Sequence, residues 1–223
     1  NWLGVPTTAA TLAPASAMRT DGNEVYSNGR VYLVDRGLTY ADADRYWKVV
    51  FVWHSPTAYK LMFGRLNNSY VDSLVLEKNP NETYTYFTFD GGGKSIVMEP
   101  KPDEWDFVFT RYRYIFYNTT PYTPYLVSGV LLNPQGIAAG LDTAKVFSEA
   151  DVAFAQQLPL STQRDEIGFN WKAYNFATSA YETKQHFTYV IRDREGYYWK
   201  LRFLDFYNGQ GEKGSPKFEF QRL

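Results

Sequence analysis

Apolar and polar residues alternate over several stretches of this chain. In RYWKVVFVWH, residues 45–54, every second position from Trp47 to Trp53 is apolar. The same period recurs in YTYFTFDG (84–91), EWDFVFTRY (104–112) and HFTYVIRDREGYYWKLRFLDFYN (186–208). Successive side chains of a strand point to opposite faces of its sheet, so this period predicts β-strands. Trp105 and Trp199 are in phase with apolar neighbours, and we expect both to be largely buried.

Turn-forming residues separate these alternating runs. DGGGK (90–94) and DREG (193–196) each lie between two runs, and glycine accepts the positive φ angles that tight hairpin turns need. EPKP (99–102) ends the short run SIVM, and GQGEKG precedes a last strand, PKFEFQRL (216–223). The order predicts an all-β fold of antiparallel, twisted sheets arranged as a meander, with one or two short helices.

One segment departs from the period of two. In AKVFSEADVAFAQQLPL (144–160), apolar residues recur at helical spacing, Ser148 with Asp151 resembles a capping box, and Pro159 stops the pattern. We therefore expect a short helix near residues 148–155.

The chain divides by composition near residue 40. We expect residues 1–40 to form an N-terminal tether and leading segment, and residues 41–223 a single β domain. VPTTAATLAPASA (5–17) is small, polar and interrupted by proline. This composition is typical of a spacer between an anchor and a folded body, and equally of a plain disordered terminus.

Composition limits the possible chemistry. The formal net charge is -1 and both signs are mixed along the chain, so nothing attracts nucleic acid or an anionic membrane surface. The chain has no cysteine, which excludes disulfides, thiolate metal sites and cysteine nucleophiles. It also has no apolar run of about 18 residues, the length needed to span a membrane.

Motifs that suggest catalysis fail on closer inspection. GGGKS needs a glycine where Thr88 stands in order to be a phosphate loop, so a hairpin turn is the better interpretation. The carboxylates of PDEWD (102–106) fit a solvated strand entrance, and those of ADAD (41–44) fit a helical turn or a solvated position. Only two histidines are present, His54 and His186, and no serine or aspartate near them has a sequence relation that suggests a catalytic triad. We expect a binding protein and not an enzyme.

Tyrosine is concentrated in TRYRYIFYNTTPYTPYLVSG, residues 110–129. The first half alternates and predicts a strand, whose aromatic residues pack in the core or across strands. The phase is lost after Tyr117, and Pro121 and Pro124 keep the following loop extended, so that Tyr122 and Tyr125 are presented. These rings either contact a flat ligand or cap the edge of a sheet.

Four segments resemble the HmuY family of haem-binding, haemophore-like surface lipoproteins. They are WDFVFTRYRYIFYN (105–118), PYLVSGVLLNPQGI (124–137), DEIGFNWKAYNF (165–176) and the ending from residue 189 to 223. The resemblance implies an all-β fold whose projecting loop fingers grip haem, with the iron held by histidines or methionines. It also implies iron acquisition at the cell surface, as an outer-membrane lipoprotein or an extracellular protein, with an outer-membrane haem transporter as partner. Membrane attachment would be through a lipid anchor that this chain lacks.

The sequence departs from this family at the iron ligands. Residues 112–181 contain no histidine and no methionine, so no ligand can be carried over and the metal ligands stay unassigned. The candidate haem contacts are Tyr117, Tyr122 and Tyr125, since tyrosinate can ligate haem iron and a tyrosine ring can stack on the macrocycle. Two functions remain open: haem or porphyrin capture with non-histidine or weakened ligation, or a surface interaction module that binds a glycan, a peptide or an envelope protein.

Overall fold

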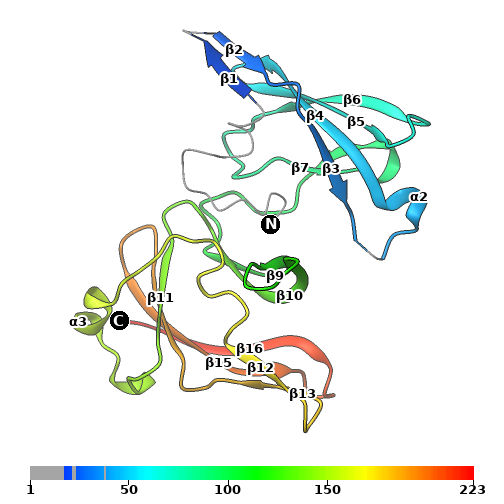
Figure 1. Ribbon diagram of the computed structural model, residues 1–223. Coiled ribbons are helices and arrows are strands. Elements are labelled where there is room, and N and C mark those ends of the chain that lie inside the picture. Colours follow the sequence, from blue (N-terminus) through cyan, green and yellow to red (C-terminus); the bar gives the residue numbers. More distant parts are fainter. Residues whose placement is uncertain (1–17, 22–23, 38) are drawn as a thin grey trace. The chain divides into compact units, whose positions relative to one another are not determined.

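The computed structural model describes residues 18–21, 24–37 and 39–223, so the tether segment 5–17 lies outside the described residues. Contacts group the chain into two compact units: an N-terminal unit up to Lys101 and a C-terminal unit from Pro102 to Leu223 (Figure 1). Each unit is described by itself. Compactness does not test independent folding, so the division at residue 40 and the single domain over 41–223 stay predictions.

A four-stranded antiparallel sheet in the order β3-β4-β5-β6 forms the body of the N-terminal unit. Its strands are β3 (Val31–Asp35), β4 (Tyr46–Ser55), β5 (Ala58–Arg65) and β6 (Val71–Glu77). Two hairpins and a helical turn accompany the sheet: β1 (Met18–Asp21) with β2 (Glu24–Ser27), β7 (Tyr86–Thr88) with β8 (Lys94–Ile96), and α2 (Asp42–Arg45). ADAD therefore opens a helical turn, one of the two interpretations of its sequence.

Aromatic rings form the core of the N-terminal unit. Trp47 is 3% exposed and stacks on Phe89 with ring centroids 4.5 Å apart, while Phe63 packs edge-to-face on Phe87 at 4.9 Å. The turn between β7 and β8 is closed by three glycines with positive φ, at residues 91–93. The predicted hairpin turn at DGGGK is thus confirmed.

The C-terminal unit is built on a second antiparallel sheet, in the order β11-β14-β15-β16. Its strands are β11 (Ala138–Asp142), β14 (Thr188–Arg192), β15 (Tyr198–Tyr207) and β16 (Lys213–Arg222). Two further hairpins belong to this unit: β9 (Phe107–Phe116) with β10 (Thr123–Leu132), and β12 (Lys172–Asn175) with β13 (Ala180–Thr183). The predicted all-β antiparallel fold with short helices is confirmed.

Trp171 lies at the centre of the C-terminal core. It is 1% exposed and stacks on Phe203, with ring centroids 4.0 Å apart and an interplanar angle of 16°. Tyr189, Leu201 and Ile167 are buried in the same apolar cluster. This core holds the bases of the strands from which both hairpins extend.

The structure corrects two expectations from the sequence. The helix α3 (Val152–Gln157) begins four residues later than expected, because residues 147–149 form a 3-10 turn and Asp151 is the cap, accepting a hydrogen bond from the Phe154 N–H at 2.8 Å. Trp105 and Trp199 are half-buried instead of largely buried. Alternation shows which side chains share a face, but not how completely that face is covered.

The helices in the described part of the chain are too short and too polar to cross a lipid bilayer.

Candidate functional site

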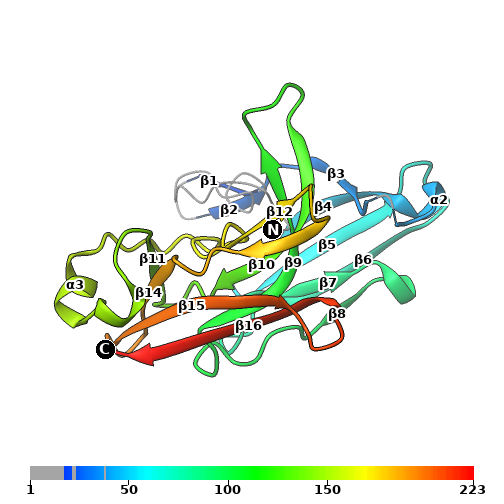
Figure 2. The same ribbon diagram turned by 90° about the horizontal axis from the view of Figure 1, so that it is seen from below.

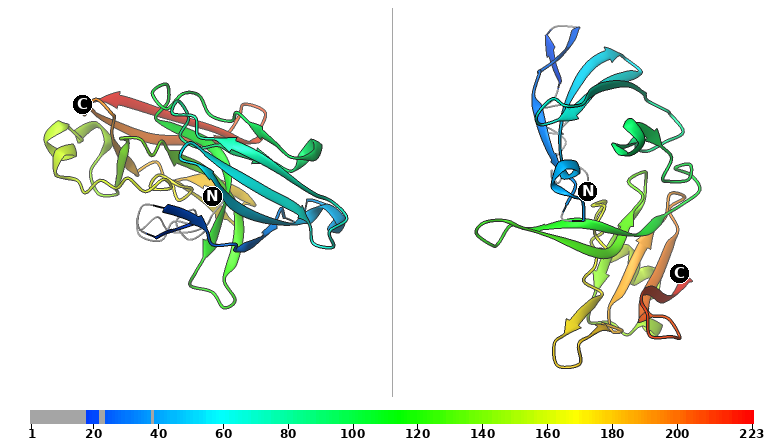
Figure 3. Two further views of the ribbon diagram at one scale, coloured as in Figure 1. Left: turned by 90° about the horizontal axis from the view of Figure 1, so that it is seen from above. Right: turned by 90° about the vertical axis from the view of Figure 1, so that its right-hand side faces the viewer.

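The β9–β10 hairpin is the longest projection of the C-terminal unit. Its strands pair over ten residues each, from Phe107 opposite Leu132 to Phe116 opposite Thr123. Figures 2 and 3 show its far end, in green, extending beyond the four-stranded sheet of this unit. A hairpin of this length places the residues near its turn away from the core that anchors its base.

The two faces of this hairpin differ in chemistry. On one face, Tyr112 and Val127 are buried at the base, and Tyr114 lies beside Phe116 farther out, with ring centroids 5.1 Å apart. The other face carries the exposed Arg111 and Arg113. The hairpin therefore presents one aromatic face and one face on which two arginines lie beside exposed apolar residues, Phe109 and Leu126.

The structure places the three predicted contact residues at the far end of this hairpin. Tyr117 and Tyr122 flank the turn, with ring centroids 5.2 Å apart in an edge-to-face arrangement. Tyr125 lies on β10 opposite Tyr114, with its ring 6.4 Å from that of Phe116. The loop is thus shorter than expected, because β10 begins at Thr123 and Tyr125 is a strand residue. All three tyrosines are more than half exposed.

A second aromatic hairpin was not predicted from the sequence. Tyr174 on β12 packs edge-to-face on Phe176 at 5.1 Å and on Tyr181 of β13 at 5.2 Å. Phe176 is 86% exposed. Such an exposed phenylalanine contributes nothing to the core, so its ring is available to a ligand.

The aromatic faces of the two hairpins lie near each other. Tyr114 packs edge-to-face on Phe169, in the segment that leads to β12, with ring centroids 5.1 Å apart. Burial raises the pKa of Tyr181, and the nearby Tyr125 hydroxyl raises it further, so these two phenols from different hairpins lie within electrostatic reach. We call the following residues the aromatic cluster: Tyr114, Phe116, Tyr125, Phe169, Tyr174, Phe176 and Tyr181.

A buried lysine ties the bases of the two hairpins together. The Lys172 ammonium, at the start of β12, donates a hydrogen bond to the Ser128 carbonyl oxygen of β10 at 2.5 Å. It also lies over the rings of Trp171 and Phe206, at 4.2 and 4.7 Å from their centroids. Burial lowers the pKa of Lys172 to about 8. Burial of the charged ammonium group of Lys172 away from water makes an unfavourable contribution to stability.

Gly129 has no side chain, and this allows β10 to pack closely against Gly168 in the segment that precedes β12. Val130 and Gly168 exchange two backbone hydrogen bonds, of 2.9 and 3.1 Å, and a Cβ on Gly129 would lie 2.6 Å from the Gly168 carbonyl oxygen. Because that oxygen belongs to the backbone, we expect Gly129→Ala to lower the free energy of unfolding by about 1–3 kcal/mol, as measured by chemical denaturation. Gly209→Ala is the control, since its Cβ would meet open space. Equal stability of the two variants would contradict this packing.

The aromatic cluster offers no histidine or methionine to a metal. His186 is exposed in the segment between β13 and β14, its ring edge-to-face with Phe187 at 4.7 Å, while His54, Met62 and Met98 belong to the N-terminal unit. Among the described residues, no three histidine, aspartate or glutamate side chains form a group that could hold a metal ion. The two hairpins could supply tyrosine oxygens and the Glu182 carboxylate of β13 as ligands.

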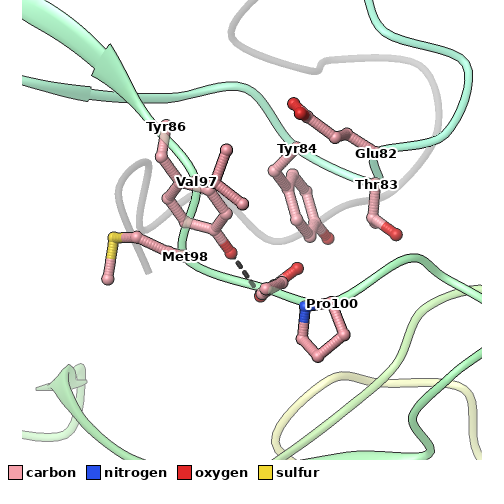
Figure 4. Close-up of a pocket in the computed structure, with 8 residues that line it drawn as sticks. Glu82, Thr83, Tyr84, Tyr86, Val97, Met98 and Pro100 are labelled. Carbon is pink, nitrogen blue, oxygen red and sulfur yellow. Dashed lines mark hydrogen bonds between the residues drawn. The ribbon is translucent and has the colours of Figure 1, made fainter.

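A small pocket in the N-terminal unit is not a comparable site (Figure 4). It lies beside Tyr84, Tyr86 and Val97, and the Tyr86 hydroxyl donates a hydrogen bond to Glu99. Its volume of about 10 Å³ holds no more than one water molecule.

Comparison with known proteins decides the family. A family model described as HmuY protein matches residues 80–220, which is more than half of the chain and includes both hairpins. The chain belongs to the HmuY family. The resemblance seen in the sequence is confirmed, and HmuY membership suggests haem binding and a surface lipoprotein at the level of the family. The comparisons with curated proteins and with solved structures each gave no match.

Proposed function

We propose that this HmuY-family protein captures haem, or a closely related porphyrin, between the aromatic faces of the β9–β10 and β12–β13 hairpins. The observation that carries the proposal is the aromatic cluster, in which rings from two separate hairpins lie near each other at the edge of the core. A porphyrin is a large flat aromatic ring, and such a ring gains most from planar side chains that can stack on its faces or meet its edge.

The exposure of the rings supports the same conclusion. Phe176 is 86% exposed and Tyr125 is 55% exposed, although both carry large apolar surfaces. Covering such rings gains roughly 25 cal/mol per Å² of apolar surface removed from water. A ligand that enters between the hairpins recovers this free energy without any change in the core.

In this proposal the iron would be coordinated by tyrosine and not by a pair of histidines. Tyr117, Tyr122 and Tyr125 remain the candidate contacts, and a tyrosinate would favour ferric iron because an anionic oxygen stabilises the higher charge. Within the cluster, the raised pKa of Tyr181 opposes formation of a tyrosinate at that residue. We therefore propose that stacking supplies most of the affinity and that the iron is weakly ligated.

The proposed setting follows from the family. We propose an outer-membrane lipoprotein or an extracellular protein that takes up haem for iron acquisition and delivers it to an outer-membrane haem transporter. The role is one of binding, with no reaction catalysed and no nucleic acid bound.

Titration with ferric haem and with metal-free protoporphyrin tests the proposal. Both ligands should give a saturable Soret shift of similar affinity, because stacking does not require iron. We expect Tyr125→Ser to weaken binding of both by roughly tenfold, since one ring contact of this kind contributes about 1–1.5 kcal/mol. Tyr125→Phe should bind like the wild type. Tyr197→Ser is the matched control, because Tyr197 is a half-exposed tyrosine in the turn before β15.

Two other outcomes are informative. If Tyr125→Phe loses ferric haem but keeps metal-free protoporphyrin, and the wild-type spectrum is high-spin and lost on reduction, then Tyr125 ligates the iron. No Soret shift with either ligand, at ligand concentrations well above that of the protein, would overturn porphyrin capture. The alternative would then hold, an interaction module that uses the same rings to bind a glycan, a peptide or an envelope protein.

A further inference from the structure

A second cavity in the C-terminal unit has features of a ligand site. It encloses about 270 Å³ and shares no residue with the aromatic cluster. Its walls are apolar and come from four strands: Phe107, Ile191, Trp199, Leu201, Phe218 and Phe220. Ligand pockets for drug-sized molecules start at about 300 Å³, so this cavity suits a smaller molecule with one aromatic ring.

Two carboxylates complete the lining of this pocket. Asp193 is 9% exposed, and its oxygens accept hydrogen bonds from the Tyr197 N–H and the Trp199 indole N–H, each at 2.7 Å. These bonds fix the Trp199 ring in the wall. Asp106, directly before β9, also lines the pocket.

Asp106 lies near charged groups of both signs. Partial burial raises the pKa of its carboxyl, and the nearby carboxylates of Asp193 and Glu195 raise it further, against the opposing effect of Arg194. The Arg194 guanidinium is itself held by the backbone carbonyl oxygens of Pro102 and Trp105. A cation beside Asp106 would add to the favourable effect of Arg194 and stabilise the charged carboxylate.

We propose that this pocket binds a small aromatic amine in its ammonium form, with the ring among the apolar walls and the ammonium group at Asp106. The ring would lie against Trp199 and Phe220, which is 62% exposed and forms the outer wall. The ammonium group gains both an ion pair and contact with aromatic faces, whereas a carboxylate in its place would meet Asp106 and Asp193.

Three probes that share one phenyl ring test the charge requirement: 2-phenylethylamine as the cation, 2-phenylethanol as the neutral analogue and 3-phenylpropionate as the anion. Binding is followed by calorimetry and by the NMR signal of the Trp199 indole N–H, which is assigned with Trp199→Phe. We expect saturable binding of the amine, with an affinity about tenfold or more above that of the anion.

Variants distinguish binding at this site from non-specific binding of the probes. Asp106→Asn should weaken the amine by about tenfold and leave the alcohol unchanged, because only the charge is removed. Phe220→Ala should weaken all three probes. Glu149→Gln is the control, since residues 147–150 pack around Lys200, whose side chain points to the opposite face of the sheet from Trp199. Equal binding of amine and anion, or an unchanged affinity in Asp106→Asn, would overturn the proposal, as would no shift of the Trp199 signal at millimolar amine.

Discussion

Trp171→Ala is expected to lower the free energy of unfolding by about 3–5 kcal/mol, because a large buried ring would be replaced by a cavity. Trp171 is 1% exposed, stacks on Phe203 at 4.0 Å and packs edge-to-face on Phe206 at 5.7 Å. The loss should appear as a lower denaturation midpoint for the C-terminal unit. Porphyrin binding should fall as well, since β12 begins at the next residue.

Two variants make this expectation specific. Trp171→Phe keeps one aromatic ring for the stack on Phe203 and should lose less stability than Trp171→Ala. Trp105→Ala removes a half-buried tryptophan of the same unit and should also cost less. A Trp171→Ala protein that unfolds at the wild-type midpoint would show that this core is not arranged as described.

Lys172→Met is expected to stabilise the protein at neutral pH by up to about 3 kcal/mol. Burial lowers the pKa of Lys172 from 10.5 to about 8, and a shift of that size corresponds to about 3 kcal/mol of unfavourable free energy for the charged form. Methionine has a similar length, fills the same space and needs no solvation. The competing loss is one hydrogen bond to the Ser128 carbonyl oxygen and the contacts with three rings, those of Trp171, Tyr181 and Phe206. These contacts offset the cost of burial only in part.

The pH dependence provides a sharper test of the same lysine. Between about pH 8 and 10.5 the unfolded chain keeps the Lys172 proton while the folded chain has released it, so the wild type gains stability as the pH rises through this window. The difference in unfolding free energy between Lys172→Met and wild type should therefore shrink from pH 8 upward. Comparing the two proteins cancels the titration of the other lysines and tyrosines. A difference that is constant with pH, or a destabilised Lys172→Met at pH 7, would contradict this account.

The fold was largely predictable because its strands are long and regular. Alternation located β4, β9 and β15, and glycine-containing turns showed that neighbouring runs pair as hairpins, as in β7–β8 and β14–β15. The start of α3 was not predictable to the residue. Both Ser148 and Asp151 are good caps by residue type, and only the backbone shows that Asp151 accepts the Phe154 N–H.

The candidate site was predictable only in part. Tyr122 and Tyr125 were recognised because two prolines interrupt the alternation there, which marks the end of the β9–β10 hairpin. The second hairpin escaped notice because β12 and β13 have four residues each, too few for a clear period. The approach of Tyr125 to Tyr181 depends on contacts between residues more than fifty positions apart, and no local pattern contains that information.

The face of the β9–β10 hairpin that carries Arg111 and Arg113 has a consequence for solubility at high concentration. Within the described sheets, β9 and β10 pair with each other, and the second edge of β10 is covered at its base, where Val130 pairs with Gly168. Nearer the turn, both strands have an edge that another chain could join. A segment rich in tyrosine and phenylalanine is prone to such fibre-like stacking. Arg111 and Arg113 place like charges on every neighbouring copy, and Pro124 offers no N–H to a strand that approaches its edge. We therefore expect these residues to oppose self-association through the exposed aromatic rings.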